Sequence, residues 1–187
     1  LIAGFFVCGF QLAFITVHMP SYLSDNGFDS SVAAASLSII GLCNIIGSLA
    51  AGHLSGLYSK KWILAFIYGA RSIVIVLFLI IPITTFTVYA FSFATGLLWL
   101  ATVPPTSGLV AQMFGLKYMG TLYGIVFLNH QIGSFSGVWL GGYLFDTTGS
   151  YDQVWWWAAI IAAITAIIHV FIDERPVERL RLAEKVI

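Results

Sequence analysis

The only ionised side chain that the sequence places deep inside an apolar segment is Arg71, near the middle of residues 62–81. Insertion into the centre of a membrane helix costs an arginine roughly 2.5 to 3.5 kcal/mol, and no Asp or Glu lies at the same depth in this chain. Two interpretations stay open. Arg71 binds an anionic ligand or supports helices that bind one, or else it snorkels or bonds to nearby carbonyl groups and to Tyr68, one turn earlier.

The neutral polar side chains within apolar segments are further candidates for contacting a solute inside a membrane. They are Gln11, His18, Asn44, Asn129, His130 and Gln131. Gln11 and His18 are seven residues apart, so they share one face of a helix. His130 could titrate near neutral pH and so couple the movement of a solute to a proton, although a lone membrane histidine is more often a hydrogen-bonded interior residue. Asn129 and Gln131 point to different faces, so at most two of these last three side chains can reach one cavity.

The sequence contains none of the motifs that mark common enzymes or metal sites. It has no HExxH, no phosphate-binding glycine loop and no GxSxG, and Cys8 and Cys43 lie in separate apolar segments. The sequence therefore predicts a protein that is not an enzyme, with no cofactor and no metal. An intramembrane protease of the rhomboid type is an alternative, and Ser134 or Ser136 with His130 is the local pair that it would use. A membrane scaffold that transports nothing is another.

Six long apolar segments position these side chains and decide the class of protein. They cover roughly residues 1–23, 31–56, 62–81, 86–112, 120–145 and 153–172. A helix needs ~20 residues to cross a hydrocarbon core about 30 Å thick, and the segments reach that length. The chain is 59% hydrophobic and 9% charged, with a mean hydropathy of +0.96. We therefore expect an all-α membrane protein, with a six-helix transmembrane bundle over residues 1–172 and a charged, amphipathic cytoplasmic tail over residues 173–187.

Charge divides the loops into two sets and predicts their sides of the membrane. The basic residues of the loops and the tail all fall on one side and are Lys60, Lys61, Lys117, Arg175, Arg179, Arg181 and Lys185. The loops of the other side contain Asp25, Asp29, Asp146 and Asp152 and no basic residue. Because basic loops stay in the cytoplasm, we expect a multi-pass protein of the plasma (inner) membrane with both chain ends cytoplasmic. Its surroundings are then membrane lipids, and the lack of a positive run predicts no nucleic-acid partner.

Small residues and prolines predict how the helices pack. Residues spaced by four along one face let two backbones approach closely, and they form two ladders: Ser48, Gly52 and Gly56, and Gly133, Gly137 and Gly141. Pro104 and Pro105 remove two backbone donors, so we expect the fourth helix to break there. Broken backbone inside a membrane is tolerated only against protein or a water-filled cavity, so the break marks an interior position.

Aromatic residues gather near the outer ends of the last two helices. They are Tyr143, Tyr151, Trp155, Trp156 and Trp157. Such residues commonly form a belt at the membrane interface, and we expect that arrangement here. His53 and His169 lie near cytoplasmic helix ends, and we expect both to snorkel.

The loop after the second apolar segment carries a recognisable pattern. Residues 52–61 read Gly-His-Leu-Ser-Gly-Leu-Tyr-Ser-Lys-Lys and resemble the loop motif G-x-L-x-D-x-x-G-[RK]-[RK] of the major facilitator superfamily. The matching positions are Gly52, Leu54, Lys60 and Lys61. Gly56 stands at the acidic position and Ser59 at the later glycine, so the gating salt bridge of the motif lacks its acid. With six helices, the chain resembles the C-terminal half, helices seven to twelve, of such a transporter.

Two more stretches, residues 115–124 and 141–151, resemble the monocarboxylate-porter-like bacterial branch of that superfamily. Characterised members bind carboxylates through an Arg on helix eight and, in oxalate–formate relatives, a Lys on helix eleven; the corresponding segments 31–56 and 120–145 contain neither. The resemblance implies two inverted three-helix repeats, with the first, second, fourth and fifth helices bordering a central cavity. It also implies secondary active transport of a small solute, with an organic anion and a coupled proton as candidates, and a missing N-terminal six-helix half as partner.

The charge pattern makes a prediction about topology. Single cysteines near Asp25 and Asp146 should react with a membrane-impermeant maleimide from outside, whereas cysteines near Lys60 and Lys117 should react only after the membrane is opened. Reversed labelling would contradict both the orientation and the number of crossings.

Overall fold

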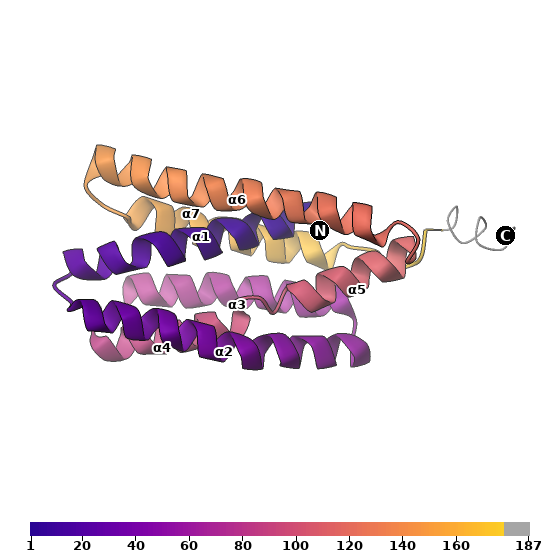
Figure 1. Ribbon diagram of the computed structural model, residues 1–187, viewed down its shortest axis with the longest axis horizontal. Coiled ribbons are helices and arrows are strands. Elements are labelled where there is room, and N and C mark those ends of the chain that lie inside the picture. Colours follow the sequence, from indigo (N-terminus) through magenta and orange to yellow (C-terminus); the bar gives the residue numbers. More distant parts are fainter. Residues whose placement is uncertain (178–187) are drawn as a thin grey trace, which may run out of the picture.

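A computed structural model describes residues 1–177, which form a bundle of α-helices and contain no β-strand (Figure 1). The helices are α1 (Ile2–Asp25), α2 (Ser30–Leu57), α3 (Lys60–Ile80), α4 (Thr85–Leu98), α5 (Val103–Phe114), α6 (Met119–Thr148) and α7 (Asp152–Val170). The expected all-α membrane fold is confirmed, with α4 and α5 as two parts of the fourth expected helix. Arg179, Arg181 and Lys185 of the expected tail lie outside the described residues.

The helices are long and apolar enough to make this an integral, multi-pass membrane protein. By length and composition, α1, α2, α3, α7 and the combined segment Thr85–Phe114 can each cross a membrane. Helix α6 is not among these five spans, although its 30 residues give it the length to cross. Its glycines and the polar run Asn129–Gln131 make it less apolar than the five candidate spans. In the bundle it lies alongside α1 for much of its length (Figure 1).

Local sequence explains where several helices begin and end. The Asp29 carboxylate accepts a hydrogen bond from the Ser31 N–H at 2.8 Å. This bond caps the start of α2, and it holds the pKa of Asp29 below its usual value. Gly27 and Gly149 follow the ends of α1 and α6 with φ angles of 79° and 71°. That left-handed conformation suits glycine because glycine has no Cβ.

The helices pack as three main pairs: α1 with α6, α2 with α4, and α3 with α7. In two three-helix repeats, α1 corresponds to α4–α5, α2 to α6 and α3 to α7. Replacing each helix by its counterpart turns the α1–α6 pair into the α4–α2 pair. The same exchange leaves the α3–α7 pair unchanged. Since three crossings separate corresponding helices, the two repeats have opposite directions across the membrane. This is the pairing expected of inverted three-helix repeats.

Glycines bring the paired backbones into direct contact. A Cβ atom built on Gly133 would overlap the carbonyl group of Phe6 in α1, and one on Gly137 would overlap that of Phe10. The ladder expected in α6 is therefore a true helix contact. The ladder expected in α2 is not, because added carbons there meet nothing closer than 3.8 Å at Gly52 and open space at Gly56.

In α2 the close contact lies on a different glycine, which the sequence pattern did not single out. A Cβ on Gly47 would overlap the backbone of Leu97, near the end of α4. A Cβ on the facing Gly96 would lie 2.7 Å from Cβ of Cys43. The two glycines belong to the paired helices α2 and α4, so this pair mirrors the glycine contact between α1 and α6.

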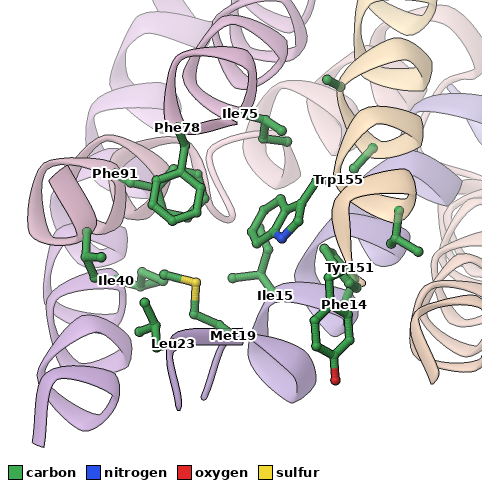
Figure 2. Packing of buried hydrophobic residues seen from close by; sticks show 14 of the residues in the cluster. Phe14, Ile15, Met19, Leu23, Ile40, Ile75, Phe78, Phe91, Tyr151 and Trp155 are labelled. Carbon is green, nitrogen blue, oxygen red and sulfur yellow. The ribbon is translucent and has the colours of Figure 1, made fainter. Parts of the chain in front are cut away.

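Aromatic packing fills the half of the bundle that contains Tyr151 and corrects the expected interfacial belt. Trp155 is fully buried, with its ring centroid 4.8 Å from that of Phe14 and 5.5 Å from that of Phe78 (Figure 2). Tyr151 is also buried, whereas Trp156 and Trp157 are exposed as expected. The reason is that α7 packs against both α3 and α1, so one face of α7 belongs to the core.

The expected snorkelling is wrong for His169 and stays a prediction for His53. His53 is exposed at the end of α2, but His169 is 1% exposed. The His169 ring lies 5.0 Å from the ring of Tyr68 in α3, and its Nδ1 lies 2.8 Å from the Thr165 carbonyl oxygen. His169 is therefore an interior residue of the α3–α7 pair.

The glycine contacts predict that the effect of a Gly→Ala substitution on stability depends strongly on its position in α6. Gly133→Ala should lower the unfolding temperature in detergent, because the new carbon meets backbone, which cannot turn aside as a side chain can. We expect a loss of about 1–3 kcal/mol, the usual cost of overpacking. Gly142→Ala, in the same helix with nothing within 4 Å of the added carbon, is the control and should unfold like the parent. Equal unfolding temperatures for the two variants would contradict the close α1–α6 contact.

Candidate functional site

The fourth span is interrupted between Leu98, the last residue of α4, and Val103, the first residue of α5. Pro104 and Pro105 lie in the first turn of α5, where a missing N–H breaks no hydrogen bond. The interruption therefore comes before the prolines rather than at them. The prolines still cause it, since they cannot donate to the carbonyl groups four residues earlier, and the Val103 N–H bonds instead to the Leu100 carbonyl at 3.0 Å.

Arg71 reaches the end of α4 from α3. Its Nε donates to the Leu98 carbonyl at 3.2 Å, and its Nη2 donates to the same oxygen at 2.6 Å and to the Trp99 carbonyl. The side chain is 5% exposed, so it faces the interior of the bundle and does not snorkel. The C-terminal carbonyls of a helix carry a partial negative charge. Of the two interpretations of Arg71, the geometry favours bonds to nearby carbonyl groups, and the end of α4 faces the cation.

Asn44 of α2 supplies the complementary group. Its side-chain Oδ1 accepts a hydrogen bond from the Leu100 N–H at 3.0 Å. The interruption therefore has its carbonyl groups bound by one helix and an amide bound by another. Side chains from α2 and α3 thus pair the backbone groups that neighbouring turns would pair in an unbroken helix.

Gln11 connects this site to α1 and α7. Its Oε1 accepts from Arg71 Nη1 at 3.4 Å, and its Nε2 donates to the Ala158 carbonyl at 2.9 Å. Arg71 also lies over the ring of Tyr68, 5.6 Å from its centroid. The small hollow beside Gln11, Arg71 and Trp99 has a volume of about 10 Å³, which is room for about one water molecule. In this conformation the hollow is too small for an organic solute.

Within the part of the chain that the structure describes, His18, Asn129 and Gln131 form no hydrogen bond with the interruption. His18 is half-buried, and its Nε2 lies 3.0 Å from the Val138 carbonyl oxygen of α6. Asn129 donates to a carbonyl of its own helix, that of Ile125, at 2.9 Å. Gln131 is exposed. The structure thus brings Gln11, Asn44 and Arg71 together at the interruption. His130 comes near them through Cys8, whose thiol lies close to both His130 and Arg71, whereas the remaining three candidates lie apart.

His130 is half-buried between aromatic and hydroxyl side chains. Its ring stacks on Phe127 with 5.3 Å between centroids, and its Nδ1 lies 3.5 Å from the Ser134 hydroxyl. That hydroxyl donates to the His130 carbonyl at 2.9 Å, and the Ser136 hydroxyl donates to the Ile132 carbonyl at 2.8 Å. Hydroxyls that bond back to their own helix are ordinary structural groups. The geometry therefore gives no support to a rhomboid-like serine nucleophile.

The loop motif gains an acidic partner that the sequence analysis missed. Glu174, just beyond α7, accepts from the Ser59 hydroxyl at 2.6 Å and from the Lys61 N–H at 2.8 Å. Lys61 Nζ donates to the Ile172 carbonyl at 3.0 Å, and Lys60 Nζ donates to Oε1 of Gln112 at 2.8 Å. The carboxylate lies at the N-terminus of α3, where a helix favours negative charge. The motif has no acidic residue at Gly56, but the carboxylate of Glu174, from a distant part of the chain, binds the same loop.

Glu174 should therefore stabilise the end of the bundle that holds the loop between α2 and α3. Glu174→Ala leaves the Ser59 hydroxyl and the Lys61 N–H without their acceptor, and we expect a loss of about 0.5–2 kcal/mol in unfolding free energy, as for a helix cap. Asp173→Ala is the matched control, since that side chain is exposed and contacts only Arg175, through an ion pair at 3.8 Å and a bond from the Arg175 N–H at 3.1 Å. Chemical unfolding in detergent measures both variants. A larger loss for Asp173→Ala would contradict the role of Glu174.

Comparisons with known proteins agree with this architecture. Residues 1–186 match the family model described as Major Facilitator Superfamily. The chain is also similar to a Bacillus subtilis (strain 168) protein described as the uncharacterized MFS-type transporter YcxA, with 27% identity over 179 residues. That alignment covers 92% of this chain and 43% of the relative, so the chain spans less than half the length of the curated relative that it matches. With helices paired as inverted repeats, a helix interrupted inside the bundle and a family match over nearly its whole length, the chain belongs to the Major Facilitator Superfamily.

Proposed function

We propose that this chain forms the C-terminal half of a secondary active transporter, which moves a small solute across the plasma (inner) membrane by alternating access. The observation that carries the proposal is the six-span bundle with paired inverted repeats, in a chain that belongs to a transporter superfamily. In transporters built from such repeats, the solute binds near the midplane and the halves rock around it. The missing partner is then an N-terminal half of six further helices.

The proposed arrangement places both ends of the bundle in the cytoplasm, with residues 1–172 as the transmembrane bundle and 173–187 as the tail. Basic residues of the loops and tail on one side support this orientation. The exposed face of α6 supports a second half as partner. It presents Phe135, Trp139 and Tyr143, which are 70%, 57% and 53% exposed. A face of that kind packs either against lipid or against another half of the protein.

The proposed solute path runs along α1, α2, α4–α5 and α6. The polar candidates along this path that are not fully buried are Gln131, His130 and Asn129 of α6, Asn44 of α2 and His18 of α1. His130 is the candidate for a coupled proton. We assign the chain to the monocarboxylate-porter-like branch on residues 115–124 and 141–151, but we propose no charge for the solute. The reason is that Arg71, the basis for expecting an organic anion, already faces the carbonyl groups of α4.

Reconstitution of the full-length protein that contains this chain tests the transport function. Proteoliposomes should accumulate at least one member of a panel of small sugars, amino acids, monocarboxylates and dicarboxylates when a proton gradient is applied. His130→Gln should lose accumulation against a gradient but keep downhill exchange, since the glutamine cannot carry the proton. His53→Gln, at the exposed end of α2, is the control and should behave like the parent.

Two outcomes would contradict parts of this proposal. No flux of any panel member above empty liposomes would count against transport. Sustained uptake by this chain alone, as a homodimer, would overturn the assignment of the chain as one half of a larger transporter.

A further inference from the structure

The hydrogen bonds at the interrupted fourth span replace those that a continuous helix would make. In an unbroken helix, the carbonyls of Leu98 and Trp99 would accept from the amides of Thr102 and Val103. In the structure both carbonyls accept from Arg71, and the Val103 N–H donates to Leu100 instead. Arg71 therefore occupies the acceptors that closure of the helix would need.

The same competition holds for the amide side of the interruption. In an unbroken helix the Leu100 N–H would donate to the Gly96 carbonyl, four residues earlier. In the structure it donates to Asn44 at 3.0 Å, and the Gly96 carbonyl accepts from the Trp99 N–H at 3.1 Å. The interruption is thus bound on both sides by side chains from other helices. In a continuous span the Leu100 N–H would turn to the Gly96 carbonyl and leave Asn44, and the carbonyl groups would accept helix amides in competition with Arg71.

Electrostatics makes Arg71 the more important of the two side chains. Arg71 as a whole is 5% exposed, and within the described residues no carboxylate forms an ion pair with it. A buried cation needs compensation, and the free carbonyl groups at the end of α4 provide it. Closing the helix would engage those carbonyl groups and leave the cation without compensation. The charge and the interruption therefore stabilise each other.

We propose that Arg71 and Asn44 form a clamp that keeps the fourth span interrupted, and that Arg71 is a positioning residue for transport rather than a solute ligand. This inference rests on the proposed transport function. Through Gln11, the clamp joins the interruption to α1 and α7. The shape of the interrupted segment, and with it the path along α1 and α4–α5, depends on a side chain that does not touch the solute.

Restoring the missing backbone donors is the sharpest test. Arg71→Leu should unfold at a lower temperature than the parent, because two carbonyl groups lose their donors inside the bundle. Adding Pro104→Ala and Pro105→Ala should recover at least half of that loss, since the span can then close and bond its own carbonyl groups. Hydrogen exchange at the amides of Thr102 and Val103 should slow at least tenfold in the triple variant relative to the parent.

A neighbouring residue provides the matched control. Ser72→Ala also removes a hydrogen bond from α3 to another helix, that of the Ser72 hydroxyl to the Ala159 carbonyl at 2.9 Å. Because this bond does not involve the interruption, the two proline replacements should not rescue Ser72→Ala. Arg71→Lys should show an intermediate loss, since an ammonium supplies the charge but not the planar set of donors.

A separate readout distinguishes a positioning role from a purely structural one. With Gln131→Cys in the full-length protein, a membrane-impermeant maleimide should label the parent from both sides of the membrane. In the triple variant, labelling from one side should fall at least tenfold even though the unfolding temperature recovers, because a closed span holds the path in one state. Labelling from both sides at the parent's rates would overturn the positioning role.

Three further results would count against the clamp or against the proposed path. A triple variant that is no more stable than Arg71→Leu, or equal rescue of Ser72→Ala, would overturn the clamp. Failure to label the parent at Gln131→Cys from either side would contradict the proposed path, whereas the unfolding and exchange measurements would still judge the clamp.

Discussion

A bilayer offers no water to backbone polar groups, so a helix can be interrupted inside it only where other groups replace its hydrogen bonds. In this protein the fourth span is interrupted, and side chains of two other helices bind the groups set free. The buried charge of Arg71 is tolerable for the same reason, since the end of α4 faces it. Two features that are each costly alone, a buried cation and a broken helix, are stable as a pair.

Much of the fold follows from local sequence. Apolar length predicts the spans, and Pro104 and Pro105 predict an interrupted fourth helix, because the missing amides act within one turn. The prolines alone do not predict the exact position of the interruption. Prolines are well tolerated in the first turn of a helix, so they start α5 rather than stand in the gap.

What the sequence could not predict depends on contacts between distant segments. The partner of Arg71 is a stretch of backbone, and carbonyl groups leave no mark in the pattern of residue types. Three consecutive tryptophans do not reveal which one faces inward, and only the position of α7 against α1 and α3 buries Trp155. Glu174 was missed because the loop that it binds lies far away in sequence; its position directly after the last span, opposite a basic loop, was the only signal.

The glycine contact between α1 and α6 has a mechanical consequence. Side chains between two helices can change rotamer and allow one helix to slide past the other, but a backbone that touches backbone has no such freedom. Gly9, Gly133 and Gly137 each lie against a main-chain carbonyl of the facing helix. The two helices therefore move as one rigid body. Any change in the width of the path beside them has to come from other elements that move relative to this pair.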